Sequence, residues 1–170
     1  MKKNILLLFV SCLFLLKGFS ENNASESNSY NVQNNALVLP STIEFDIHAY
    51  DVKDNKDPML DYIAQYLKDR PTITKLRIEG HVYTEKSAEE NLKLSLQRAA
   101  IISYYLTERG ISCDRLIPVA FGDMKPVAPT DECNINYNTR VDFFNAEMNY
   151  KAVAGNAIDG FAAKVFNPCE

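Results

Sequence analysis

Residues 87–110 read SAEENLKLSLQRAAIISYYLTERG. Ser87 followed three positions later by Glu90 is a capping box, and the segment then contains no glycine or proline until Gly110, which supplies a C-terminal stop. One face of this segment carries polar groups and one cation beside apolar anchors, at the helical spacing i, i+3, i+4, i+7 and i+11: Asn91, Leu94, Ser95, Arg98 and Ile102. The sequence therefore predicts the longest helix of the chain here.

Shorter elements surround this helix. LVLPSTIEFDI (37–47) predicts the first strand, because Ile43, Phe45 and Ile47 alternate with acids. Asp57-Pro58 is typical of a helix start, and this helix should end before Pro71. Three further strands are expected at 75–80, 115–121 and 139–144, with a loop over 122–137. The order β-α-β-α-β-β predicts an α/β fold, a two-layer sandwich with helices packed on a mixed sheet.

The first twenty residues predict a cleaved signal peptide. Lysines precede an apolar run from Ile5 to Leu16, and small residues occupy the −3 and −1 positions of a cut after Ser20. The run of about 12 residues is shorter than the ~20 that a membrane-spanning helix needs. A lipoprotein cut before Cys12 stays an alternative, although Phe9 is a poor −3 residue. We expect no transmembrane segment in the mature chain.

Composition predicts one folded domain with two tails. Residues 21–36 are rich in asparagine and serine and predict a flexible leader, 37–145 form the domain, and 146–170 form a C-terminal extension with a short helix near 158–166. Removal of residues 1–20 takes away three lysines and no acid, which leaves 15 basic and 22 acidic residues and a net charge of −7. This charge argues against nucleic acid as a partner.

The exported chain keeps three cysteines, Cys113, Cys133 and Cys169. Export into an oxidising compartment favours a disulfide, and three cysteines allow three single pairings. We expect the bond to involve Cys133, since that residue lies in the longest predicted loop.

Five short motifs are shared with a known family: Gly80-His81, Asn91 to Ala99, Gly110-Ile111, Phe121 to Val127, and Asn138 to Asp142. Together they resemble the signature of the OmpA-like C-terminal domain, over residues 38–144. The resemblance implies a non-catalytic cell-envelope domain that binds the diaminopimelate-type peptide stem of peptidoglycan. It also implies a periplasmic location with an outer-membrane association, peptidoglycan as the partner, a second envelope protein as a further partner, and no metal or cofactor. No catalytic motif is recognisable in the sequence.

The ligand side of this domain implies a set of site residues. Arg98 is the central candidate, because an arginine fork can grip a carboxylate with paired charge-assisted hydrogen bonds. In the family an aspartate faces this arginine. Ungapped spacing puts Tyr83 at that position and a gapped alignment puts Glu85 there, and the sequence leaves both open. The candidate list is completed by Asn91, Leu94 and Arg140.

The missing aspartate supports an alternative function. An uncharged phenol at Tyr83 cannot balance an ammonium group as a carboxylate does. In that case the chain is a degenerate OmpA-like module that has lost peptidoglycan binding and acts as a periplasmic scaffold for other proteins.

Overall fold

The computed structural model describes residues 29–46, 48–53, 57–130, 135–153 and 164–170. The predicted signal peptide, Cys12 and most of the predicted leader lie outside these residues. Within the described ranges, no helix combines the length and the apolar character that crossing a membrane requires.

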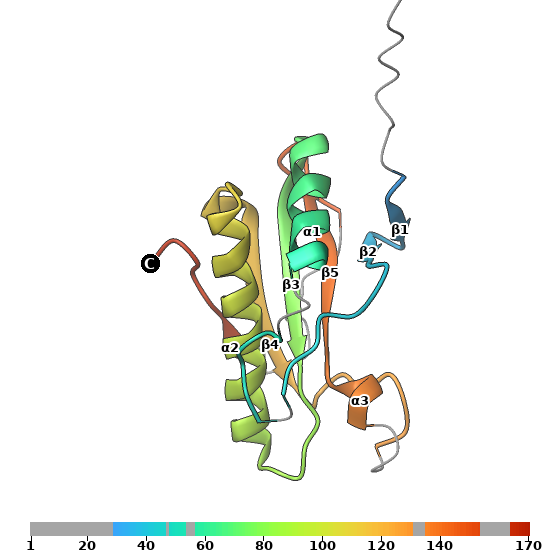
Figure 1. Cartoon of the computed structure of the whole chain (residues 1–170), viewed down its shortest axis with the longest axis vertical. Helices are drawn as coiled ribbons and strands as arrows, with labels where there is room; N and C mark the ends of the chain where they lie inside the picture. The colour runs from blue at the N-terminus through green and yellow to red at the C-terminus, as the bar shows by residue number, and fades with distance from the viewer. Residues whose placement is uncertain (1–28, 47, 54–56, 131–134, 154–163) are drawn as a thin grey trace, which may run out of the picture.

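Two helices cover one face of a seven-stranded sheet (Figure 1). They are α1 (Asp57–Asp69) and α2 (Ala88–Glu108), and two short helices, η2 (Cys113–Arg115) and α3 (Ile135–Asn138), lie in connections. The strands are β1 (Asn31–Gln33), β2 (Ala36–Val38), β3 (Ile73–His81), β4 (Leu116–Gly122), β5 (Arg140–Met148), β6 (Lys151–Ala152) and β7 (Lys164–Val165).

The sheet is mixed, with the order β1-β2-β5-β3-β4-β7 and β6 paired to β5. β3 runs parallel to β4 and antiparallel to β5. The parallel pair needs a crossover connection, and α2 is that crossover. This arrangement confirms the predicted α/β two-layer sandwich.

Both long helices begin and end where the sequence indicates. The capping box of α2 is formed in both directions, with the Ser87 hydroxyl accepting from the backbone N–H of Glu90 and the Glu90 side chain accepting from the backbone of Ser87. The chain leaves α2 through Gly110 at φ 81°, a left-handed conformation that glycine adopts at low cost. α1 begins at Asp57 and ends at Asp69, before Pro71.

The core lies between the helices and the sheet. Its fully buried side chains come from α1, α2, β3 and β5, and they include Leu60, Ile63, Leu67, Ile102, Leu106, Leu76, Ile78 and Phe143. α2 approaches the sheet closely at Gly80, where an added Cβ would lie 2.2 Å from the carbonyl oxygen of Ser95. The glycine of the Gly-His motif is therefore required by packing.

The first strand was predicted too far along the chain: within the described part of 37–47, only Leu37 and Val38 lie in a strand, β2. Ile43 to Asp46 form no strand, and Phe45 makes only an isolated bridge to Val52. Instead β1 and β2 form a hairpin, and Ala36 pairs with Phe144 of β5. β1 lies inside the segment expected to be a flexible leader. The hairpin buries Leu37, which is 4% exposed, and this apolar anchor explains why the sheet begins there.

The end of the chain adds to the sheet. β5 continues to Met148, beyond the predicted end at 144, and β7 pairs with the edge of β4. A disulfide joins Cys113 of η2 to Cys169, so the expectation of a bond through Cys133 is wrong. Its loop of 56 residues contributes about 4 kcal/mol to stability in the chain-entropy model. Cys133 and most of the predicted helix at 158–166 lie outside the described residues.

Candidate functional site

A groove of about 1210 Å³ lies between the segment 36–46 and the start of β5. Its walls are largely apolar, and six charged side chains also line it: Glu44, Asp46, Lys53, Arg98, Arg140 and Asp142. Two of the predicted site residues, Arg98 and Arg140, therefore line one groove although 42 positions separate them. A largely apolar groove with a few polar groups is typical of a small-ligand site.

Arg98 is engaged by the chain itself. Its Nε donates a hydrogen bond to the carbonyl of Ala49 at 3.0 Å, and its Nη2 donates to the carbonyl of Asp46 at 2.7 Å. The guanidinium lies 4.6 Å from the ring centroid of Phe45, a cation–π contact. Burial lowers the pKa of Arg98 to about 10, so it stays charged at neutral pH. Arg98 thus ties Phe45, Asp46 and Ala49 to α2.

Arg140 lies at the first position of β5 and is more accessible. Its Nε donates to Oδ2 of Asp142 at 2.8 Å, and its side chain is 20% exposed. Among the residues that the structure describes, its Nη atoms reach the carbonyls of Lys125 and Asn138, at 3.3–3.5 Å. Asp142 is itself one-third exposed and lines the same groove. The guanidinium is oriented through one strong contact and several long ones.

Asn91 and Leu94 are buried on the inner face of α2. Asn91 is 1% exposed; its Oδ1 accepts from the Thr84 hydroxyl at 2.6 Å, and its Nδ2 donates to the carbonyls of Thr84 and Lys86 at 3.4 Å. Leu94 is 8% exposed. Neither residue lines the groove. Asn91 instead fixes the loop before α2 to the helix.

Tyr83 and Glu85, the two alternatives for the missing aspartate, lie outside the groove lining. Tyr83 donates from its hydroxyl to the carbonyl of Thr130 at 3.0 Å, and its backbone exchanges hydrogen bonds with the Thr139 hydroxyl. Glu85 is exposed. Neither alignment therefore places a carboxylate in the groove, whereas Asp142 is there.

Charged side chains of β3 form a cluster with Asp142 of β5 that the sequence analysis did not predict. Glu79 is 3% exposed and pairs with Nε of Arg77 at 2.7 Å, while Nε2 of His81 lies 3.5 Å from a carboxylate oxygen of each of Glu79 and Asp142. Burial lowers the pKa of His81, and the two carboxylates only partly offset this effect. The signal in the sequence was the alternation of Arg77, Glu79 and His81 on one face of β3.

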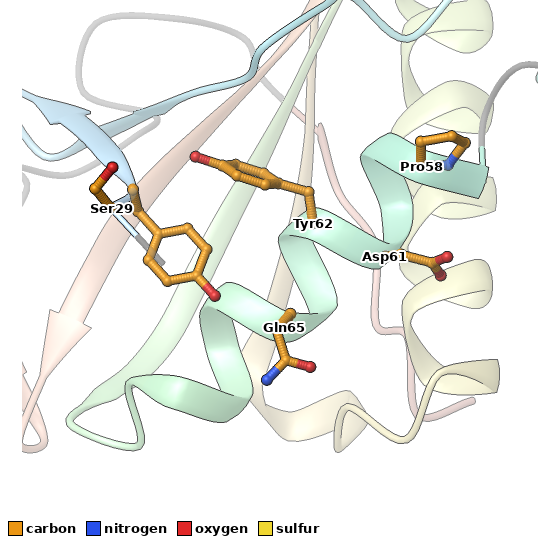
Figure 2. Close-up of a pocket in the computed structure, with 6 residues that line it drawn as sticks. Ser29, Pro58, Asp61, Tyr62 and Gln65 are labelled. Carbon is orange, nitrogen blue, oxygen red and sulfur yellow. The ribbon is translucent and has the colours of Figure 1, made fainter. Parts of the chain in front are cut away.

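A smaller hollow of about 600 Å³ lies on α1 (Figure 2). Tyr62 and Gln65 project into it from α1, and Ser29 approaches from the start of the described chain. The ring of Tyr30 packs edge-on against Tyr62, and its hydroxyl donates to Asp69 at 2.5 Å. None of the predicted site residues lies there, so the larger groove is the candidate site.

Comparison with known proteins gives a consistent result. The model of the OmpA family matches residues 44–140. The chain is 34% identical over 90 residues to the peptidoglycan-associated lipoprotein of Rhizobium meliloti, which covers 53% of this chain and 51% of that protein. It is 31% identical over 113 residues to the peptidoglycan-associated lipoprotein of Buchnera aphidicola, which covers 66% of this chain and 61% of that protein. The chain thus spans between half and two thirds of the length of these relatives.

A solved structure is also similar. The crystal structure of the peptidoglycan-associated lipoprotein from Burkholderia pseudomallei superposes with a TM-score of 0.56 at 32% sequence identity, over 61% of this chain and 87% of that one.

Proposed function

The chain belongs to the OmpA family, and from this premise we propose that its domain holds the peptide stem of peptidoglycan without cutting it. Family membership and the peptidoglycan-associated relatives make this a cell-envelope binding domain and not an enzyme. The proposal names a diaminopimelate-type stem as the ligand and the periplasm, beside the outer membrane, as the location. The names of the relatives support the peptidoglycan part of this proposal.

The observation that carries the proposal is the groove that Arg98, Arg140 and Asp142 line together. A stem peptide that ends in an amino acid offers carboxylates, and diaminopimelate adds an ammonium group. An arginine suits the first because its donors match a carboxylate in pairs, and an aspartate suits the second. The apolar walls exclude water and strengthen such contacts.

Retention on purified sacculi tests this function. The exported protein should sediment with intact sacculi and should stay in solution when the stem peptides have first been removed by an amidase. The matched control is an exported protein of similar charge without this domain, which should stay in solution with both preparations. Failure of the protein to sediment with intact sacculi would refute the proposal.

One observation favours the scaffold alternative, namely the absence of a carboxylate at Tyr83. If the site has decayed there, the wild type should fail to bind sacculi and Tyr83→Asp should bind. A wild type that binds sacculi would reject the scaffold alternative as we define it, because that alternative requires loss of the ligand.

A further inference from the structure

The C-terminal tail, residues 164–170, closes one edge of the sheet (Figure 1). It lies beyond the part of the chain that matches the OmpA family, residues 44–140, and its strand β7 pairs antiparallel with β4. The disulfide between Cys113 and Cys169 joins the tail to η2, which lies directly before β4. Among the described residues that line the groove, none belongs to β4, to β7 or to the disulfide, so the role of the tail is independent of the proposed function.

β4 is a strand whose outer edge needs protection. Its sequence, LIPVAFG, contains no charged residue, and the side chains of Val119, Ala120 and Phe121 are fully buried. Natural sheets protect their edges with charged side chains, proline, bulges or a covering segment, because the unpaired N–H and C=O groups of an edge strand can pair with another chain. β4 has Pro118 and the tail as its protection. The tail therefore covers an edge that would otherwise be free to pair.

The contacts of the tail with this edge are slight. β7 has two residues, and the side chains of Val165 and Phe166 are 56% and 39% exposed. The backbone N–H of Phe166 donates to the carbonyl of Pro118 at 3.1 Å, beside the two-residue ladder. Because so little apolar surface is buried, these contacts alone hold the tail weakly. The disulfide compensates by keeping β7 at a high effective concentration beside β4.

The disulfide is accessible to a dithiol reductant. Cys169 is exposed and Cys113 is half-buried. Asn167 shapes the end of the tail, since its Oδ1 accepts from the backbone N–H of Cys169 at 3.1 Å and its Nδ2 donates to Glu170 at 2.9 Å. A thiolate of the dithiol can attack one sulfur from solvent, which forms a mixed disulfide and releases the other cysteine. The second thiol then releases the first cysteine, so the dithiol becomes a disulfide and the chain gains two electrons and two protons.

We propose that the tail is a redox-controlled cover, and that the edge of β4 beneath it is a docking surface for a second copy of this chain. While the disulfide is closed, the tethered β7 outcompetes strands in solution. After reduction β7 leaves, and β4 of one chain pairs antiparallel with β4 of another about a two-fold axis, the commonest symmetry of homodimers. An uncharged strand suits pairing with its own copy, because no like charges then face each other.

Sedimentation velocity over a range of concentrations tests the cover. Every sample carries Cys133→Ser, which leaves only the two cysteines of the disulfide in the exported chain. Reduction with dithiothreitol should raise the self-association constant at least about tenfold above that of the oxidised protein, since the tethered competitor is lost. Cys169→Ser without reductant should match the reduced protein. A reduced protein that associates no more than the oxidised one would overturn the proposal.

Two controls separate edge pairing from aggregation of a destabilised chain. Cys113→Ser should associate as Cys169→Ser does, because each opens the same bond, and unequal association would assign the effect to one side chain and reject the cover. A peptide of residues 164–170 that carries Cys169→Ser, at millimolar concentration, should reverse the association of the Cys169→Ser protein, because it returns the missing strand to β4. The same residues in scrambled order should have no effect. Equal effects of the two peptides would identify aggregation and refute the edge contact.

Hydrogen exchange then locates the docking surface. At low concentration the amides of β4 should exchange faster in the reduced protein than in the oxidised one, and their protection should return as the concentration rises. The amides of β3, which lies inside the sheet, should stay protected throughout and report that the domain is folded. Amides of β4 that never lose protection, or protection that returns at another element, would exclude β4 as the docking edge. Loss of protection in β3 as well would mean that the disulfide holds the whole domain folded, which also overturns the proposal.

Discussion

The inner face of α2 and the first residues of β5 carry two halves of the same sequence signature, and their polar groups differ in burial. On α2, Asn91 and Arg98 are each 1% exposed. On β5, the side chains of Arg140 and Asp142 are 20% and 33% exposed. Both arginines line the groove and both donate hydrogen bonds to the chain itself. The comparison teaches that membership of one family motif does not fix how deeply a polar residue is buried.

The largest effect should come from filling the contact between α2 and β3. Gly80→Ala places a Cβ 2.2 Å from the backbone oxygen of Ser95, which cannot yield as a flexible side chain would. We expect a loss of about 3 kcal/mol of unfolding free energy, as for overpacked cores, measured by urea denaturation.

Gly110→Ala is the control for Gly80→Ala. It meets no atom within 4 Å and suffers only from its φ of 81°, with an expected cost of about 1 kcal/mol. Equal stabilities of the two variants would show that α2 and β3 are not in the close contact described.

The next effect tests whether Asn91 serves the fold or the ligand. Asn91→Ala leaves the Thr84 hydroxyl and two carbonyls without their partner and should cost about 2 kcal/mol. Thermal unfolding measures this loss, and Lys93→Ala on the exposed side of α2 should change stability by less than about 0.5 kcal/mol. An Asn91→Ala protein of wild-type stability that no longer binds sacculi would return Asn91 to the site.

A smaller effect is expected from pH, through the cluster that joins β3 to Asp142. Burial lowers the pKa of His81, and the charge of Arg140 also lowers it. Glu79 and Asp142 raise the pKa, but their effect is smaller. The unfolded chain therefore binds more protons at this residue than the folded chain does. The stability contributed by neutral His81 is fully present above its ordinary pKa of about 6.5, and it is lost as the pH falls toward the lower pKa of the folded protein.

The shifted pKa of Glu79 also makes the folded protein less stable as the pH falls. Burial raises its pKa, but the imidazole of His81 and the charges of Arg77 and Lys125 outweigh this and leave the pKa lowered. Its stabilisation is present above the ordinary carboxyl pKa and is lost as the pH falls through the folded value. His81→Gln should flatten the stability profile between pH 7 and pH 5, by at most about 1.4 kcal/mol per pH unit. A profile as steep as that of the wild type would exclude His81 as the titrating group.

The sequence predicted the helices well because their signals are local. The capping box at Ser87 and the stop at Gly110 depend on neighbours within one turn, and the structure confirms both. α1 begins at Asp57, where the sequence indicates a helix start. The first strand was misplaced because alternating apolar residues indicate one buried face but do not show whether that face packs in a sheet or against another element. Phe45 is half-buried against Arg98 and not in the sheet, which alternation cannot distinguish.

The site was less predictable for a related reason. Nothing within the sequence of α2 shows that the donors of Arg98 are taken by the carbonyls of Asp46 and Ala49, about 50 positions earlier. The place of Asp142 in the groove likewise follows from the sheet register, which pairs it with Glu79. Local pattern therefore selected both arginines but could not show what each of them contacts.

The smallest effect is expected from Glu85→Gln. This substitution tests the gapped alignment, which makes Glu85 the carboxylate of the site, against the structure, which places Glu85 outside the groove lining. Glu85 precedes α2 and is exposed, whereas Arg98 lies seven residues beyond Asn91, about 10 Å further along the helix. Glu85 is also absent from the groove lining, so an ammonium group in the groove would pair with one of the carboxylates that line it: Glu44, Asp46 or Asp142. Exposed charges interact weakly at physiological salt, and we expect Glu85→Gln to change retention on sacculi by less than about twofold. A larger loss would restore Glu85 as the carboxylate of the site and would require the loop of residues 84–86 to fold over the groove when the ligand binds.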